Sequence, residues 1–199
     1  MKIVIIKYNA GNIQSVSFAL ERLGFQSEIT ADHESIRKAD KVIFPGVGEA
    51  STTMAYLKKE GLDQLIPSLT QPVLGICLGM QLMCSHSEEG DTPCLGIFDE
   101  KVKKFIAPEQ KTEKFKIPHM GWNQLINPKE PLFTKELENE FVYFVHSYYV
   151  ATGPDTAAES HYIHPFSAAL RKNNFFATQF HPEKSSKAGE QILKNFLEM

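Results

Sequence analysis

Residues 73–81 read Val-Leu-Gly-Ile-Cys-Leu-Gly-Met-Gln, and this stretch decides the fold. Val73 to Ile76 is a short, mainly apolar run that predicts a buried strand, and residues 78–86 are expected to form a helix directly after it. Glycines two positions either side of Cys77 relieve crowding where the chain folds back from strand to helix. Such a turn lifts the cysteine sulfur to the carboxyl edge of a sheet, where open α/β sheets bind their ligands.

This context predicts that Cys77 is a nucleophile. The partial positive charge of the following helix N-terminus favours the thiolate, and the backbone N–H of Leu78 can stabilise an oxyanion. The alternative is that Cys77 is a small buried apolar residue, as most free cysteines are. The combination of strand, paired glycines and helix favours the nucleophile.

The chain before this turn alternates between strands and helices. Strands are expected at residues 2–6, 27–30 and 41–44, and helices at 13–23 (capped by Asn12), 49–60 and 61–69. This order predicts a parallel sheet with helices on both faces.

The chain after the turn has closely spaced strands, which indicates antiparallel pairing. They are expected near residues 97–105, 122–126, 141–150, 166–170 and 175–180, with a final helix from about 185. The predicted fold is therefore α/β, with a mixed, mostly parallel central sheet flanked by helices and an antiparallel extension.

Length and composition limit the classes of protein to consider. The 199 residues are expected to form a single domain over residues 1–199. The net charge of -3 argues against nucleic acid as a main partner, and no apolar run approaches the roughly 18 residues of a membrane span. Three sparse cysteines without a signal peptide indicate a cytoplasmic protein. No C-x-x-C pair is present, and neither a metal nor a cofactor is expected.

His181 is the best candidate for the base that a cysteine hydrolase requires. It follows an apolar strand, residues 175–180, and Glu183 lies two residues further on. In an extended segment both side chains point the same way, so the carboxylate could orient the ring. The alternative is a surface His–Glu pair at a helix start, and the nearby cysteine turn favours the catalytic interpretation.

Residues 45–48, Pro-Gly-Val-Gly, follow the third expected strand. Their glycines let backbone amides approach a ligand closely. An N–H of Val47 or Gly48 could therefore complete the oxyanion hole with Leu78. Alone, this sequence would be an ordinary turn.

These three pieces together resemble the class I glutamine amidotransferases, which carry a G-x-C-x-G turn and a downstream H-P-E. The resemblance covers essentially the whole chain and implies the flavodoxin-like architecture of that family. It also implies the chemistry: Cys77 attacks the side-chain amide of glutamine, and His181 protonates the leaving ammonia. Glu183 orients His181, and water then releases glutamate from the thioester.

Four further blocks narrow the resemblance to the glutaminase subunits of imidazole glycerol phosphate synthases, enzymes of histidine biosynthesis. Together with the cysteine turn, these blocks make five matches in order. Asn9 stands where the family often has glycine. The four blocks are residues 8–12, 118–123, 143–148 and 181–185.

The narrower resemblance implies two further sets of site residues. Some of these residues also have a purely structural interpretation. Gln81 and Glu89 could belong to a polar helix face, Trp122 could lie in the core, and Lys184 could be a solvated surface lysine. The residues implied to hold glutamine are Gln81, Glu89 (for the α-ammonium), Ser147 and Tyr148. The residues implied to face a partner near the ammonia exit are Asn12, Trp122, Tyr143 and Lys184.

A glutaminase of this kind needs a partner, because free ammonia protonates in water and is then no longer a nucleophile. The resemblance implies a (β/α)8 barrel cyclase subunit, which would use the channelled ammonia to make imidazole glycerol phosphate and an aminoimidazole carboxamide ribonucleotide. Three alternatives stay open: a paralogue serving another acceptor enzyme, a stand-alone cysteine hydrolase, and a non-catalytic protein with an exposed thiol.

Overall fold

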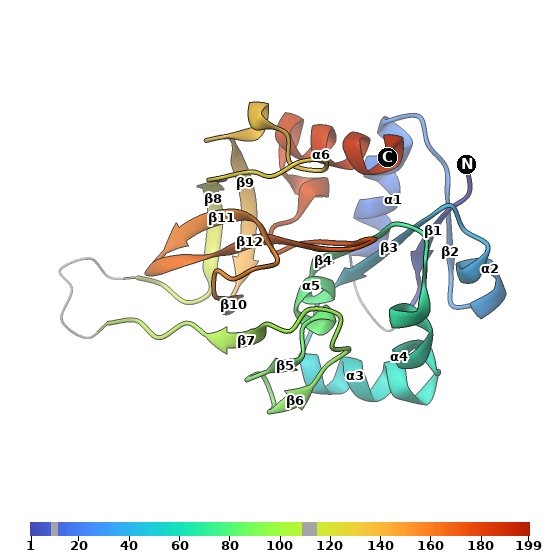
Figure 1. Cartoon of the computed structure of the whole chain (residues 1–199), viewed down its shortest axis with the longest axis horizontal. Coiled ribbons are helices and arrows are strands. Elements are labelled where there is room, and N and C mark those ends of the chain that lie inside the picture. Colours follow the sequence, from blue (N-terminus) through green and yellow to red (C-terminus); the bar gives the residue numbers. More distant parts are fainter. Residues whose placement is uncertain (9–11, 109–114) are drawn as a thin grey trace.

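A computed structural model describes residues 1–8, 12–108 and 115–199 of the chain. Its centre is a seven-stranded sheet in the order β11-β12-β13-β4-β3-β1-β2 (Figure 1). The five strands from β13 to β2 are parallel, and β12 and β11 are antiparallel to their neighbours. The expected mixed, mostly parallel sheet is confirmed. The strands are β1 (Ile3–Ile6), β2 (Ser27–Thr30), β3 (Lys41–Gly46), β4 (Val73–Cys77), β11 (Thr156–Tyr162), β12 (His164–Lys172) and β13 (Phe175–Thr178).

Helices cover both faces of this sheet. In Figure 1, α1 and α6 lie above the sheet and α3, α4 and α5 lie below it. None of the described helices is long and apolar enough to cross a membrane. The helices are α1 (Ile13–Arg22), α2 (His33–Arg37), α3 (Ala50–Lys59), α4 (Leu62–Leu65), α5 (Leu78–Met83) and α6 (Ser186–Glu198), with 3₁₀ turns η1 (Ile66–Ser68), η2 (Lys135–Leu137) and η3 (Pro182–Lys184).

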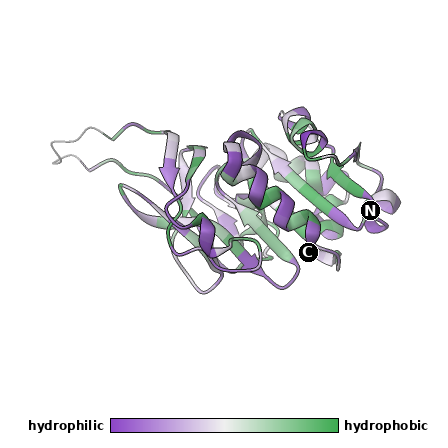
Figure 2. Ribbon diagram, turned by 90° about the horizontal axis from the view of Figure 1, so that it is seen from above, coloured by the Kyte–Doolittle hydropathy of each residue, from purple (hydrophilic) through white to green (hydrophobic). Residues whose placement is uncertain are grey.

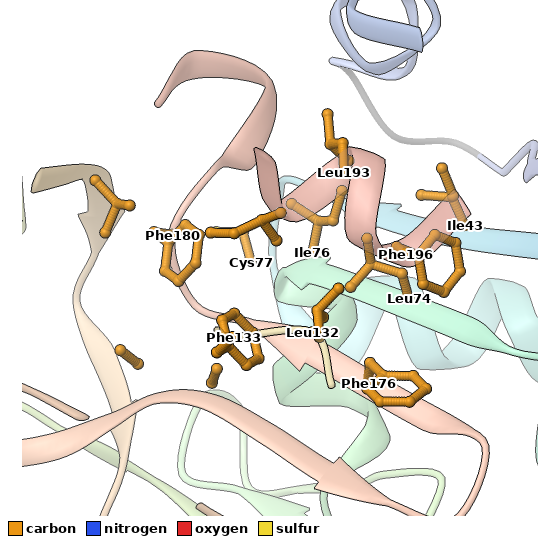
Figure 3. Close-up of a cluster of buried hydrophobic side chains, with 14 of the residues drawn as sticks. Ile43, Leu74, Ile76, Cys77, Leu132, Phe133, Phe176, Phe180, Leu193 and Phe196 are labelled. Carbon is orange, nitrogen blue, oxygen red and sulfur yellow. The ribbon is translucent and has the colours of Figure 1, made fainter. Parts of the chain in front are cut away.

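The central strands are apolar throughout because both faces are buried. Successive side chains of a strand point to opposite faces, so Ile3 and Ile5 pack towards α1 and α6, whereas Val4 and Ile6 pack towards α3 and α4. Figure 2 shows the central strands in the hydrophobic colour, with both colours on the helices that cover them. Figure 3 shows the α6 side, where Leu193 and Phe196 lie against side chains of β3, β4 and β13.

The second half forms two smaller sheets. A four-stranded sheet has the order β10-β7-β5-β6, and β8 pairs with β9 as an antiparallel hairpin. These strands are β5 (His86–Ser87), β6 (Thr92–Pro93), β7 (Lys101–Lys104), β8 (His119–Gln124), β9 (Phe141–His146) and β10 (Tyr148–Val150).

Several expected boundaries are wrong. The single strand expected at 141–150 breaks at Ser147, and its two halves, β9 and β10, belong to different sheets. The helix expected to reach residue 86 ends at Met83, because the chain turns there to form β5. The helix α2 was not expected, although the Asp32 side chain caps it by accepting a hydrogen bond from the N–H of Ser35. Strands β6 and β11 were also not expected.

Two glycines allow the turn between β4 and α5. A Cβ atom at Gly79 would lie 2.0 Å from the carbonyl oxygen of Phe44 in β3, and one at Gly75 would lie 2.8 Å from the sulfur of Met83. The first contact is with backbone, which cannot move without disturbing the sheet. The structure therefore shows the predicted crowding at both glycines that flank Cys77, where a larger residue would not fit.

Replacing Gly79 with alanine should destabilise the protein by about 3 kcal/mol, because the new methyl group overlaps backbone in a packed core. The measurement is the free energy of unfolding in denaturant. Gly153→Ala is the control, since a Cβ atom there would meet only the flexible Glu100 side chain, at 3.2 Å. Equal losses in the two variants would contradict the packing argument.

Candidate active site

Cys77 occupies the turn at the carboxyl end of β4. Its backbone has φ 54° and ψ −110°, a left-handed conformation that a side-chain-bearing residue rarely adopts. In the sheet register its neighbour on β3 is Gly46. Strain of this kind persists where the surrounding structure enforces it, and it clusters at functional sites. The turn leaves Cys77 largely buried but lining a cavity.

His181 and Glu183 form a buried pair. The His181 Nδ1 atom lies 2.8 Å from Oε1 of Glu183. The expectation that an extended segment aligns the two side chains is wrong, since Pro182 to Lys184 forms the 3₁₀ turn η3. The tight η3 turn instead brings the Glu183 carboxylate back to the His181 ring. Both side chains are almost inaccessible to solvent.

The backbone of His181 is held by the β9 strand. Its N–H donates to the carbonyl oxygen of Tyr143 at 2.9 Å. The buried Ser185 hydroxyl donates to the carbonyl oxygen of His181 at 2.7 Å and accepts from the N–H of Tyr143 at 3.0 Å. Sequence reasoning gave Ser185 no role of its own. A serine after H-P-E-K suggests a helix cap at most, and its bond to Tyr143 is visible only in the fold.

The environment of His181 favours its protonated form. Burial lowers the pKa of the ring, but hydrogen bonds and charge interactions with Cys77 and Glu183 outweigh burial and raise the pKa of His181 to about 10. A protonated ring beside the sulfur stabilises a thiolate and can donate a proton to a leaving group. The three side chains therefore form a set that can perform nucleophilic acyl transfer.

Asn12 lies closer to the chemistry than expected. Its Nδ2 atom donates to Oε1 of Glu183 at 2.5 Å, so the side chain contacts the carboxylate that pairs with His181. It also precedes α1 with a left-handed backbone, φ 70°. Within the block at residues 8–12, Asn9 to Gly11 lie outside the residues that the structure describes.

A cavity of about 350 Å³ opens over Cys77 and His181. It contains the predicted oxyanion residues and all four predicted glutamine-holding residues. Glu183 lies behind His181 and does not line the cavity, and Asn12, Trp122 and Tyr143 also lie outside it. The lining residues are Val47, Gly48, Cys77, Leu78, Gln81, Glu89, Pro118, Val145, His146, Ser147, Tyr148, His181 and Lys184.

Gln81 is buried, so it does not lie on a solvated helix face. Its Nε2 atom donates to the carbonyl oxygen of Tyr148 at 3.2 Å and to Oε1 of Gln179 at 2.9 Å. Gln179 in turn donates from Nε2 to Cys77 Sγ at 3.8 Å. Sequence reasoning did not identify Gln179, because its role depends on contacts between segments far apart in the chain.

Glu89 lies in the turn between β5 and β6 rather than on a helix. Its Oε2 atom accepts from the N–H of Ala50 at 2.8 Å, at the start of α3. Burial raises the pKa of Glu89, the Ala50 N–H opposes this effect, and the charge of Glu49 adds to it. A cation in the cavity would relieve the cost of this partly buried negative charge.

The β8–β9 hairpin presents an apolar face to solvent. Trp122 pairs with Tyr143 across the hairpin, with ring centroids 5.9 Å apart. Trp122 is 52% exposed and is not a core residue, and Met120 and Phe141 on the same hairpin are 63% and 51% exposed. Exposed apolar side chains grouped in this way are typical of an interaction surface.

His161 and His164 are separated by two residues, a spacing that two metal ligands can have. His161 and His164 lie on the two strands of the β11–β12 hairpin. Among the described residues, no group of three or more histidine, cysteine, aspartate or glutamate side chains could hold a metal ion.

Comparisons with known proteins match nearly the whole length of the chain. The family model described as "Glutamine amidotransferase class-I" matches residues 4–199. The chain is 63% identical over the full length of both chains to the imidazole glycerol phosphate synthase subunit HisH of Bacteroides thetaiotaomicron. It is 47% identical to the HisH subunit of Idiomarina loihiensis, over 100% of this chain and 98% of that one. A solved glutamine amidotransferase shares the fold, with a TM-score of 0.72 at 18% identity, over 98% of this chain and 97% of that one.

Replacing Cys77 with alanine should lower the pKa of His181 below its value of about 10, because the sulfur's hydrogen bond and charge help to hold the proton. The wild-type ring should stay protonated as the pH rises through neutrality, and the variant ring should lose its proton at lower pH. Ring resonances of His181 followed by NMR against pH measure both. The partly exposed His33 ring, whose resonances should not respond to the substitution, is the internal control. An unchanged His181 titration would show that the sulfur does not interact with the ring.

Proposed function

Because the chain belongs to the class I glutamine amidotransferase family, we infer that it hydrolyses glutamine to glutamate and ammonia at Cys77. The relatives at high identity are HisH subunits of imidazole glycerol phosphate synthase. We therefore assign the chain to the same step of histidine biosynthesis, acting as one glutamine amidotransferase domain over residues 1–199. The observation that carries the proposal is that Cys77 and His181 line one cavity, while Glu183 bonds to His181 from behind it.

The proposed reaction begins with the thiolate. The Cys77 sulfur attacks the side-chain amide carbon of glutamine, and the carbonyl electrons move onto its oxygen. The N–H of Leu78, with that of Val47 or Gly48, stabilises the resulting oxyanion. Collapse of the intermediate expels ammonia, which takes its proton from His181, and leaves a glutamyl thioester. His181 then accepts a proton from water as the water attacks, and glutamate leaves with Cys77 restored.

The cavity walls support a glutamine bound by its backbone end. Glu89 offers a carboxylate to the α-ammonium, and Ser147 and Tyr148 line the same cavity. Both N–H groups of the Gln81 amide already have partners, so its carbonyl oxygen is the atom left to accept from the substrate. These contacts would orient the substrate amide towards Cys77.

The partner we propose is the (β/α)8 barrel cyclase subunit, which would receive ammonia without exposing it to water. It would make imidazole glycerol phosphate and an aminoimidazole carboxamide ribonucleotide. The exposed face with Trp122 and Tyr143 and the Lys184 side chain at the cavity rim support a docking site there. Asn12 bonds to Glu183, so a partner that moves Asn12 would also act on the triad.

The three cysteines are free, which suits a reducing cytoplasm.

The test of the function measures glutamate release from glutamine in three conditions: the chain alone, with the cyclase, and with the cyclase and its nucleotide substrate. We expect strong release only in the third, and Cys77→Ala should reduce that release about a thousandfold or more. Strong release by the chain alone would instead indicate a stand-alone cysteine hydrolase. Full activity of Cys77→Ala in the complex would contradict the assigned nucleophile.

Replacing Glu89 with glutamine should raise the KM for glutamine about tenfold with little change in kcat, because it removes a charged partner that binds substrate and transition state alike. The pKa of Glu89 is raised, so wild-type KM should climb as the pH falls and this carboxylate takes up a proton. The variant should lack that climb. Glu88→Gln is the matched control, since Glu88 is exposed and bonds the N–H of Lys104 instead. A parallel rise of KM with acid in both variants would argue against Glu89.

A further inference from the structure

Two buried histidines beside the cavity have no part in the proposed reaction. His119 on β8 and His146 on β9 are register partners in the hairpin. They are 4% and 5% exposed, and the Nδ1 atom of His119 lies 2.9 Å from Nε2 of His146. Only His146 lines the cavity.

The hydrogen bonds of the pair fix the proton on each ring. His146 Nδ1 lies 2.7 Å from the carbonyl oxygen of Tyr148, which can only accept, so Nδ1 carries the hydrogen. The Nε2 atom of His146 is then an acceptor and receives the Nδ1–H of His119. The Nε2 atom of His119 is in turn placed to accept from Nδ2 of Asn123, at 3.3 Å. Every ring nitrogen is satisfied when both rings are neutral.

The surroundings keep the rings neutral. His119 stacks between Phe144 and Tyr162, with centroids 5.0 and 4.1 Å away, and Phe105 and Phe166 pack against His146. Burial lowers the pKa of His119 to about 4 and that of His146 to about 3, and the nearby His181 charge also disfavours a proton on His146. If either ring took up a further proton, an N–H of that ring would face the N–H of its hydrogen-bond partner.

The hydrogen bonds of the histidine pair continue to residues that line the proposed glutamine site. The Tyr148 carbonyl oxygen that receives the His146 N–H also receives the Nε2–H of Gln81, which continues through Gln179 to the Cys77 sulfur. Ser147 marks the break between β9 and β10, where its carbonyl oxygen accepts from the N–H of Phe105 at 3.0 Å and Tyr148 pairs with Lys104 of β7. The bond from His146 spans this break and adds a restraint that acts on the Tyr148 carbonyl oxygen itself.

We propose that His119 and His146 are positioning residues for glutamine, which hold the Ser147–Tyr148 segment and Gln81 in the shape that binds the backbone end of the substrate. The inference rests on the proposed function. His146 acts through the Tyr148 carbonyl. His119 donates to Nε2 of His146 and so reinforces the tautomer that lets His146 donate there. A purely apolar core would be served by phenylalanine at both positions, without the cost of burying ring nitrogens.

The test compares His146→Asn with His146→Leu in the complex with the cyclase and its nucleotide substrate. The two new side chains have the same shape, but only asparagine keeps an N–H donor where Nδ1 stood. We expect leucine to raise the KM for glutamine about fivefold to tenfold with kcat little changed, and asparagine to recover most of that loss. Thermal unfolding of both variants reports on the fold.

Nitrogen NMR of the rings gives a second measurement that needs no turnover. Wild-type His146 should carry its hydrogen on Nδ1, and His119→Leu should release the ring to mix both tautomers. A wild-type complex that releases no glutamate would refute the proposed function, and the inference with it. An active wild type with equal KM values for the asparagine and leucine variants would overturn the inference alone, as would an Nε2–H tautomer of wild-type His146.

Discussion

The left-handed turn at Cys77 is the constraint on which the site depends. The turn brings α5 so close to β3 that Gly79 touches the Phe44 carbonyl, a contact that leaves no room for a side chain. Fixing α5 in this way also fixes the proposed nucleophile above the sheet edge and Gln81 one turn along the same helix. The buried parallel strands supply the rigidity that holds the strained residue in place.

The rest of the proposed triad, His181 and Glu183, comes from the other end of the chain and is attached by backbone as much as by side chains. The Tyr143 strand binds the His181 N–H, and Ser185 ties the two segments together. The helix α6 then packs on the η3 turn, where a Cβ atom at Gly189 would lie 1.9 Å from the Pro182 carbonyl oxygen. Two close glycine contacts, at Gly79 and Gly189, thus fix the two halves of the proposed catalytic set.

Histidines near one cavity carry opposite protonation states because their partners differ. His181 meets a carboxylate and a sulfur, and these keep its proton. His146 meets a carbonyl oxygen and a second neutral ring inside an aromatic cluster, and these keep it uncharged. Groups whose environments separate their pKa values can divide the tasks of a site, and the roles proposed here are proton transfer for His181 and positioning for His146.

The sequence by itself determined the alternation of strands and helices, the cysteine turn and the pairing of His181 with Glu183. These depend on local patterns: apolar periodicity, glycines at fixed offsets and short spacing along the chain. Only the tertiary structure decided that strand 141–150 breaks at Ser147, that Asn12 contacts Glu183, and that Gln179, Ser185 and His146 adjoin the site. Each of these contacts joins segments far apart in sequence or depends on burial, and buried polar side chains take partners from whichever strands the fold places beside them.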